Sequence, residues 1–287
     1  MASLVYALLW CLSLVPLRLL YVLSWAAAWV LRVGIRYRRK VVEDNLRACF
    51  PEASDQELHQ WTKGYYRHLA DVMVEMIKVA SMSPNQLASR MKLDHDALGQ
   101  SIYQGGKGGV IIASHYGNFE WLSLRCGSWL AEHGVPSAGI YARLSKGSWG
   151  KIILSLRAKW GMLLIPKHKA LIKSLQLMKE GYIIGFMTDQ APPKEGPSVM
   201  IDFLGRPTAW MPPAAKLALR NGGPMLYADV ERLGRGRYQV HLTELSVPEN
   251  PRSAEAAEEV TRQYVKLLEA RIKKDPAFWL WSHRRWK

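Results

Sequence analysis

The sequence predicts an α/β fold, with a mostly parallel central sheet flanked by helices and an N-terminal hydrophobic membrane helix. Two observations lead to this expectation. Short apolar runs alternate with amphipathic segments between residues 110 and 187, which is typical of parallel sheets with right-handed crossovers. Residues Leu4 to Leu31 are almost wholly apolar. We therefore expect a membrane-anchoring helix over residues 1–31 and one α/β domain over residues 32–287.

The apolar stretch is long enough to span a bilayer, which takes roughly 20 residues, but Pro16 and Arg18 interrupt it. A charge at mid-bilayer costs on the order of 3 kcal/mol. Two arrangements stay open: a spanning helix whose Arg18 snorkels or faces protein, and a helix–break–helix lying in the interface. The basic residues that follow favour a cytoplasmic side and a patch for anionic headgroups, or else a solvated helix face. They are Arg32, Arg36, Arg38, Arg39 and Lys40.

Helices dominate the next part of the chain. A short helix is expected over residues 41–50, before Pro51. Ser54-Asp-Gln-Glu57 is a capping box that begins a long amphipathic helix to about Ala80. Further expectations are a short helix from Ser83-Pro84, a strand over 91–93 and a helix from Asp94 to Tyr103.

The alternating region then predicts four strands and three helices. The strands are Val110–Ala113, Ser137–Tyr141, Leu163–Ile165 and Tyr182–Met187. The helices are Asn118–Glu132, Ser148–Trp160 and Lys169–Glu180. Further on, Pro224–Arg232 and Tyr238–Leu245 flank Gly234-Arg-Gly236, which predicts a hairpin, and a helix over Ala254–Lys274 follows.

The loop after the first of these strands carries the clearest chemical signal. His115 lies where strand gives way to helix, at the carboxyl edge of the sheet, where α/β proteins bind ligands. Gly117 permits a tight turn, Asn118 is a candidate N-cap, and Glu120 falls in the first helical turn. The spacing indicates an imidazole base with a carboxylate behind it. A buried histidine satisfied by a nearby glutamate is the structural alternative.

A neutral imidazole can take the proton from a hydroxyl that attacks a carbonyl, and a carboxylate on its other ring nitrogen fixes the tautomer. Ser114 directly precedes His115, and neighbours in sequence rarely face each other. We therefore expect the nucleophile to come from the substrate.

Polar residues also follow other expected strands. Arg143 follows Tyr141 and is a candidate to hold a phosphate or carboxylate bidentately, and Asp189 and Gln190 follow the strand that ends at Met187. Neighbouring parallel strands would bring Arg143 and Asp189 near His115, with Asp189 orienting the arginine or binding substrate. Membership in a structural ion pair is the alternative for each.

Two later segments are candidate substrate contacts. Arg206 and Thr208 precede an expected helix with Pro212 and Pro213 near its start, where an anion would be favoured; a plain capping turn is the alternative. His283 and Arg284 lie in a C-terminal segment rich in tryptophan, which predicts either a membrane-facing tail or a phosphate site.

The amino-acid composition limits the classes of binding partner and cofactor to expect. The formal net charge of +15 favours an anionic partner: nucleic acid, an anionic membrane, a phosphorylated substrate or an acidic protein. The three cysteines have no spacing that suggests a disulfide framework or a zinc site. Without HExxH, P-loop or GxGxxG motifs, zinc hydrolase, NTPase and dinucleotide enzymes lack support, and we expect no metal or cofactor.

An ordered set of motifs resembles a known family over nearly the whole chain. The segment from Ser114 to Glu120 looks like the His-x4-Asp/Glu motif of glycerolipid acyltransferases. Together with the other motifs it resembles the lauroyl/myristoyl-type late acyltransferases of bacterial lipid A biosynthesis. Those motifs are Asn45-Leu-Arg-Ala-Cys-Phe-Pro51, Tyr141-Ala-Arg143, Asp189-Gln190, Phe203-Leu-Gly-Arg-Pro-Thr208 and Trp279-Leu-Trp-Ser-His-Arg-Arg-Trp286.

The resemblance implies an inner-membrane enzyme that moves a fatty acyl chain from acyl carrier protein to a hydroxyl of a lipid A precursor. His115 would act as base and Glu120 would orient it, while Asn118, Arg143 or main-chain N–H groups would stabilise the oxyanion. Different acceptors stay open: a lysophospholipid, a glycolipid or a lipoamino acid. A hydrolase that uses the same dyad also stays open, as does a non-catalytic basic protein that binds membrane or nucleic acid.

Overall fold

The computed structural model describes residues 2–94, 102, 106–141, 160–193 and 195–286, with side chains from residue 6 onward. It is α/β, as expected, with a seven-stranded sheet in the order β1-β9-β8-β2-β5-β3-β4. The strands are β1 Met91–Asp94, β2 Gly109–Ala113, β3 Ser137–Tyr141, β4 Met162–Pro166, β5 Ile183–Met187, β8 Met225–Gly234 and β9 Arg237–Glu244. Neighbouring strands are parallel except β8 and β9, which form the expected hairpin.

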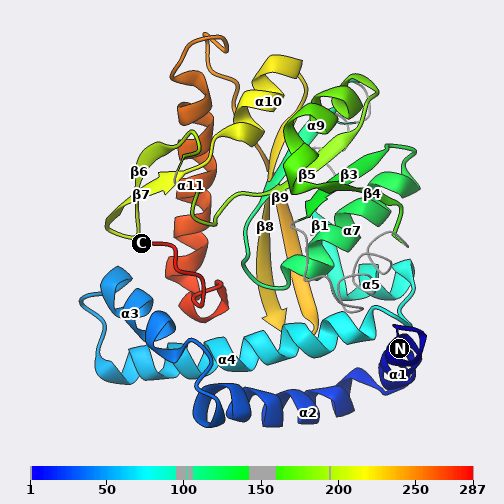
Figure 1. The fold of residues 1–287 in the computed structure, drawn as a ribbon, viewed down its shortest axis with the longest axis vertical. Coiled ribbons are helices and arrows are strands. Elements are labelled where there is room, and N and C mark those ends of the chain that lie inside the picture. Colours follow the sequence, from blue (N-terminus) through cyan, green and yellow to red (C-terminus); the bar gives the residue numbers. More distant parts are fainter. Residues whose placement is uncertain (1, 95–101, 103–105, 142–159, 194, 287) are drawn as a thin grey trace.

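Helices surround this sheet, and most lie where the sequence predicts them (Figure 1). They are α1 Ala2–Leu14, α2 Leu17–Trp29, α3 Arg39–Cys49, α4 Asp55–Lys78, α5 Pro84–Arg90, α7 Phe119–Glu132, α9 Ala170–Lys179, α10 Pro213–Asn221 and α11 Ala256–Lys274. The capping box at Ser54 and Glu57 is confirmed, and a second one joins Ser83 and Gln86. The helices expected over 94–103 and 148–160 fall mainly outside the described residues, as does Arg143.

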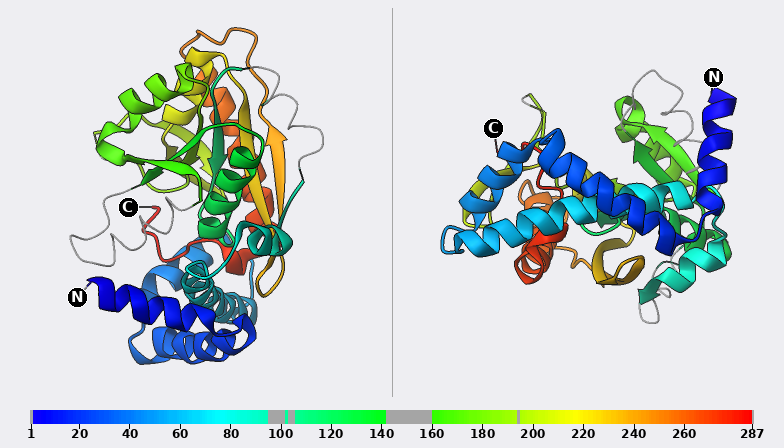
Figure 2. Two further views of the ribbon diagram at one scale, coloured as in Figure 1. Left: turned by 90° about the vertical axis from the view of Figure 1, so that its right-hand side faces the viewer. Right: turned by 90° about the horizontal axis from the view of Figure 1, so that it is seen from below.

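The apolar N-terminal stretch forms two helices that meet at Pro16. Proline ends the hydrogen bonding of α1, and α2 then runs beside α4, below the sheet in Figure 1 and in the left view of Figure 2. Every third or fourth residue of α2 is buried: Leu17, Leu20, Tyr21, Ser24 and Ala28. The structure therefore confirms a break at Pro16, while both expected positions of the helices relative to a bilayer stay predictions. The segment Leu17–Gly34, which includes a π-helical turn over Val30–Gly34, is long and apolar enough to cross a membrane.

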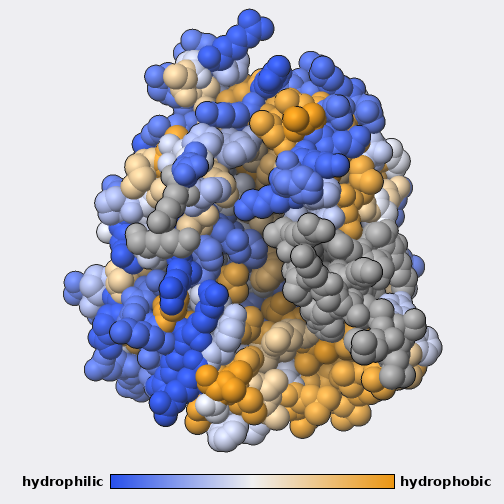
Figure 3. Space-filling view, in the orientation of Figure 1, coloured by the Kyte–Doolittle hydropathy of each residue, from blue (hydrophilic) through white to orange (hydrophobic). Residues whose placement is uncertain are grey.

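The rest of α2 is exposed and apolar. Its outward residues include Leu19, Val22, Leu23, Trp25 and Trp29, each more than half exposed. Apolar side chains gather along the lower edge of the molecule in Figure 3, the edge on which α2 lies in Figure 1. An apolar face of this size on a helix indicates contact with a membrane or a partner.

One sequence expectation about secondary structure is wrong. Arg206 and Thr208 do not lie at the N-terminus of the expected helix but on β7 (Arg206–Trp210), which pairs with β6 (Val199–Phe203) in a separate antiparallel hairpin. Leu204 and Gly205 both have positive φ, 52° and 73°, so they form the two-residue turn that joins twisted strands. The helix begins only at Pro213.

Candidate functional site

Strand register brings His115 and Asp189 together. In the buried core of the sheet, β2 pairs with β5 so that Ala113 lies opposite Met187. His115 and Asp189 each lie two residues beyond this pair, at the carboxyl ends of adjacent parallel strands. The predicted proximity of Asp189 to His115 is therefore confirmed.

The contact between them is a hydrogen-bonded pair rather than mere proximity. His115 Nδ1 lies 2.7 Å from Asp189 Oδ1, and the backbone N–H of His115 donates to Oδ2 at 2.9 Å. The indole Nε1–H of Trp279 donates to the same Oδ2 at 2.8 Å. With its proton on Nδ1, the imidazole carries a lone pair on Nε2, which is the arrangement required of a general base.

Asp189 remains ionised although it is buried. Burial alone would raise the pKa of this carboxyl, but the interaction with His115 and the hydrogen bonds from His115 and Trp279 hold the pKa below its usual value. The side chain of His115 is 16% exposed and that of Asp189 is 2% exposed. A fixed negative charge thus lies behind a partly accessible imidazole, where it favours the imidazolium form that proton abstraction creates.

Two further side chains surround the imidazole. The amide nitrogen of Gln190 lies 3.3 Å from His115 Nε2, where it can donate to the lone pair, and the ring of Phe119 packs edge-on with centroids 4.8 Å apart. A substrate hydroxyl that gives its proton to Nε2 must take the place of the Gln190 amide.

The structure corrects the role expected for Glu120 behind the imidazole. The carboxylate on Nδ1 is Asp189, because strand pairing brings it to that side of the ring. Glu120 is half-buried in the first turn of α7, after the loop. A catalytic role for Glu120 on the substrate side stays a prediction.

Asn118 is the N-cap of α7, as predicted. Its Oδ1 accepts from the backbone N–H of Trp121 at 2.8 Å, and its Nδ2 donates to Glu75 of α4 at 2.6 Å. The residue is 0% exposed. Both polar atoms are bonded to protein, so Asn118 shapes the loop, and its contact with substrate stays a prediction.

The C-terminal segment folds back over residues 114–118, the candidate catalytic loop that carries His115. The backbone N–H of Gly117 donates to Phe278 O at 3.0 Å, and that of Leu280 donates to His115 O at 3.1 Å. Asn45 of α3 holds the segment from its other side by donating to the carbonyls of Trp281 and His283. The segment therefore fixes the backbone of the loop that carries the imidazole.

This folding back rules out a membrane-facing role for the first tryptophans of the tail. Trp279 is 2% exposed and Trp281 is 0% exposed, and Trp279 packs on Phe203 of β6. Arg284 is exposed, whereas Nε2 of His283 accepts from the backbone N–H of Ala191 at 3.0 Å. His283 thus supports the segment that begins with Asp189.

The two predicted anion contacts on β7 differ in accessibility. Thr208 is 1% exposed; its hydroxyl donates to Arg206 O and accepts from the indole of Trp286. Arg206 is half-buried, with its guanidinium 4.6 Å from the centre of the Trp286 ring. Thr208 therefore acts within the hairpin, while anion binding by Arg206 stays a prediction.

Nearby thiol and hydroxyl groups are poor nucleophiles. Ser114 is 5% exposed and its hydroxyl lies 3.4 Å from that of Tyr227. Burial raises the pKa of the Cys126 thiol to about 12, which keeps it protonated. The site is therefore suited to activating a hydroxyl supplied by a substrate.

An apolar cavity of about 70 Å³ lies between α7 and the sheet. Its walls include Ile111 and Ala113 of β2, Gly185 and Met187 of β5, and Met162 of β4. Ala113 and Met187 are two residues before His115 and Asp189, so the cavity reaches the ends of the two strands that precede this pair. Methionine side chains are flexible, which allows such a cavity to widen around an extended chain.

Sequence reasoning missed three features of the site: Asp189 as the partner of His115, Trp279 as a donor to Asp189, and Glu75 behind Asn118. The signal for the first was the equal distance of His115 and Asp189 from the ends of two adjacent strands. No comparable signal links Glu75 or Trp279 to the loop, because those contacts join elements far apart in the chain.

Comparison with known proteins adds one finding. The family model for bacterial lipid A biosynthesis acyltransferases matches residues 1–287. No curated protein matches the chain.

Proposed function

The chain belongs to the bacterial lipid A biosynthesis acyltransferase family, and we propose that it moves a fatty acyl chain from acyl carrier protein to a hydroxyl of a lipid A precursor. We place this reaction at the bacterial inner membrane, with the catalytic domain on the cytoplasmic face. The observation that carries the proposal is the His115–Asp189 pair, which follows two strands whose last residues, Ala113 and Met187, line an apolar cavity. The chemistry needs a base for a hydroxyl and an apolar space for a chain. The His115–Asp189 pair supports the first, and the apolar cavity, whose walls include Ala113 and Met187, supports the second.

The proposed reaction is direct transfer while both substrates are bound. Nε2 of His115 takes the proton of the acceptor hydroxyl, whose oxygen attacks the thioester carbonyl. Glu120 orients that hydroxyl, and main-chain N–H groups at the start of α7 stabilise the oxyanion. The C–S bond then breaks, and His115 gives its proton to the leaving thiolate. Asp189 stabilises the imidazolium between these two steps.

The charged and apolar surfaces support the proposed partners. Acyl carrier protein is acidic, which suits a chain of net charge +15. A lipid A precursor is phosphorylated and membrane-bound; Arg206 and Arg284 are candidate phosphate contacts, as is Arg143 beyond the described residues. The exposed apolar face of α2 would lie in the membrane and bring the site to the acceptor.

A substitution of Gly185, which lines the cavity, tests whether the acyl chain binds there. A Cβ at Gly185 would meet only Ala138 O at 3.8 Å, so a side chain there fits and occupies the cavity. We expect Gly185→Val to shift the preferred donor to chains about two carbons shorter and to lower kcat/KM for the longest chains by about tenfold or more. Competition between acyl carrier proteins charged with chains of different length measures the shift.

The matched control is Gly234→Val, at the far end of β8, where a Cβ would meet nothing within 4 Å. It should leave chain preference unchanged. An unaltered preference in Gly185→Val would place the acyl chain elsewhere.

The function itself is tested by single-turnover acyl transfer. Protein reconstituted in vesicles receives acyl carrier protein or coenzyme A carrying a labelled chain, together with lipid A precursors and lysophospholipids. Labelled lipid A product from acyl carrier protein is expected. Label on lysophospholipid alone would move the protein to glycerolipid acylation. Salt-dependent binding of nucleic acid without any transfer would favour the non-catalytic alternative.

A further inference from the structure

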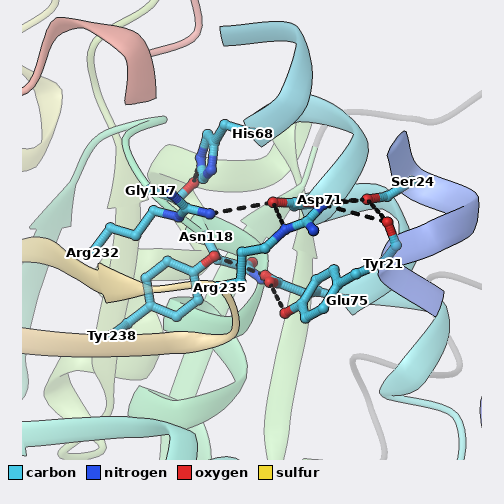
Figure 4. Close-up of polar contacts among 10 residues, drawn as sticks. All are labelled: Tyr21, Ser24, His68, Asp71, Glu75, Gly117, Asn118, Arg232, Arg235 and Tyr238. Atoms are coloured by element: carbon cyan, nitrogen blue, oxygen red, sulfur yellow. Dashed lines mark hydrogen bonds and ion pairs between the residues drawn. The ribbon is translucent and has the colours of Figure 1, made fainter. Parts of the chain in front are cut away.

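Helix α4 carries a row of three buried polar residues that faces the catalytic loop: His68, Asp71 and Glu75 (Figure 4). Their spacing of three and four residues places them on one side of the helix. They are 5%, 1% and 0% exposed. Burying a polar or charged side chain costs free energy unless it is hydrogen-bonded. The partners of these three side chains therefore show which parts of the protein the row holds together.

Two of the three hold the catalytic loop. His68 Nε2 lies 3.1 Å from Gly117 O, and burial lowers the pKa of this histidine to about 4, so its neutral ring can donate to the carbonyl. Glu75 accepts from Asn118 Nδ2, and its backbone carbonyl accepts from the indole of Trp121 at 3.0 Å. The turn between His115 and α7 is thus held from the side of α4.

The same row binds α2. The hydroxyl of Tyr21 donates to Glu75 Oε1 at 2.6 Å, and the hydroxyl of Ser24 donates to Asp71 Oδ1 at 2.6 Å. The two contacts have equal length and both are buried, but the two carboxylates differ in their other partners. Asp71 bonds to Arg232 and Arg235, whereas Glu75 bonds to the catalytic loop.

Glu75 depends more on its α2 partner than Asp71 does. Besides Tyr21, the Glu75 carboxylate accepts from Asn118 Nδ2 at 2.6 Å and from the hydroxyl of Tyr238 at 2.8 Å, both at Oε2. All of these donors are neutral. Burial raises the pKa of the Glu75 carboxyl, and the hydrogen bonds from these donors only partly oppose that rise. Without Tyr21, Oε1 loses the phenol hydroxyl that donates to it, while Asp71 would still have two guanidinium groups after the loss of Ser24.

Tyr21 is also held in place by its surroundings. The guanidinium of Arg235 lies 4.5 Å from the centre of the Tyr21 ring. A Cβ on Gly236, in the β8–β9 turn, would collide with the Tyr21 hydroxyl. The phenol therefore has a defined position between α2, α4 and the hairpin.

We propose that Tyr21 is a positioning residue of the active site, acting on the His115 loop through Glu75 and Asn118. Helix α2 is then a component of the site as well as an apolar surface. The inference rests on the proposed function for its kinetic consequence, but the link from Tyr21 to the loop stands on the contacts alone.

The test compares Tyr21→Phe with Ser24→Ala in the full chain, in vesicles. Each variant removes one buried hydrogen bond from a hydroxyl of α2 to a carboxylate of α4. Any effect of weaker packing of α2 on α4 should therefore be present in both variants. Hydrogen exchange of the backbone amides of residues 116–122 reports on the loop, and kcat and KM are measured beside it. Thermal unfolding is followed for both variants.

Tyr21→Phe is expected to speed exchange in residues 116–122 and to lower kcat, each about tenfold, with KM unchanged for both substrates. Ser24→Ala should leave kcat within about twofold of the wild type. In a Glu75→Gln background, adding Tyr21→Phe should lower kcat by less than about twofold, because the carboxylate through which Tyr21 acts on the loop is already absent.

A merely structural role predicts lower thermal stability with normal loop exchange and normal kcat for the folded enzyme. That result would overturn the proposal, as would equal effects of Tyr21→Phe and Ser24→Ala. If the wild type transfers no acyl chain to any acceptor, the proposed function fails, and the exchange data still decide whether Tyr21 positions the loop.

Discussion

His115→Ala is expected to lower single-turnover acyl transfer by at least ~10²-fold, the usual scale for loss of a general base. In the proposed mechanism, Nε2 of His115 takes the hydroxyl proton and later gives it to the thiolate, and the variant removes this atom. It also leaves the buried Asp189 carboxylate without its imidazole partner. Binding of the acyl chain should change little, because the cavity walls do not include His115.

The measurement uses saturating donor and acceptor, so that only the chemical step is compared. His59→Ala is a suitable control, since His59 is an exposed histidine of α4 that contacts Arg32 at 2.9 Å. It should retain normal turnover. Near-normal turnover in His115→Ala, with the fold intact by circular dichroism, would contradict the proposed mechanism.

Asp189→Asn is expected to lower turnover roughly 10³- to 10⁴-fold through the tautomer of His115. Two donors, the backbone N–H of His115 and the indole of Trp279, point at Oδ2, so the oxygen of an asparagine must occupy that position. Its NH₂ group then faces Nδ1 and donates to it. The ring proton moves to Nε2, and the atom that should act as the base carries a proton.

Two further carboxylate variants sharpen this test in the same turnover assay. Asp229→Asn changes a carboxylate paired with Arg271 outside the catalytic loop, and it should leave turnover within about threefold of the wild type. Glu120→Gln changes the carboxylate that is proposed to orient the substrate hydroxyl, so its effect can be compared with that of Asp189→Asn. A large effect of Glu120→Gln together with a small effect of Asp189→Asn would show that Glu120, and not Asp189, supports the base.

The sequence predicted the sheet well because its strands are short, apolar and separated by amphipathic helices. The strand Ser137–Tyr141 has the predicted bounds, and most of the others begin or end within a residue or two. These are local patterns, set by burial and backbone preference. The β6–β7 hairpin was missed because Leu204 adopts positive φ, which is unusual for leucine and gives no turn signal.

Only those parts of the candidate site that depend on residues close together in sequence were predicted. His115, the loop and the N-cap at Asn118 follow from residues close in sequence. The partner of the imidazole does not, because it depends on which strands lie side by side. Glu120 is nearer to His115 in sequence, whereas the pairing of β2 with β5 brings Asp189 to Nδ1. The buried row on α4 is likewise invisible in a sequence where those positions read as an ordinary amphipathic helix.

The C-terminal segment that braces the His115 loop has a consequence for biosynthesis. Trp279 donates to Asp189, and the carbonyl of Phe278 and the amide of Leu280 bond to the loop. A nascent chain therefore lacks these bonds until ribosomes have translated well past the sheet. Helix α2 is translated far earlier and can meet the bilayer while the base is still unsupported. Under the proposed function, an acyl thioester would therefore meet a supported imidazole only after α2 has had time to bind a membrane.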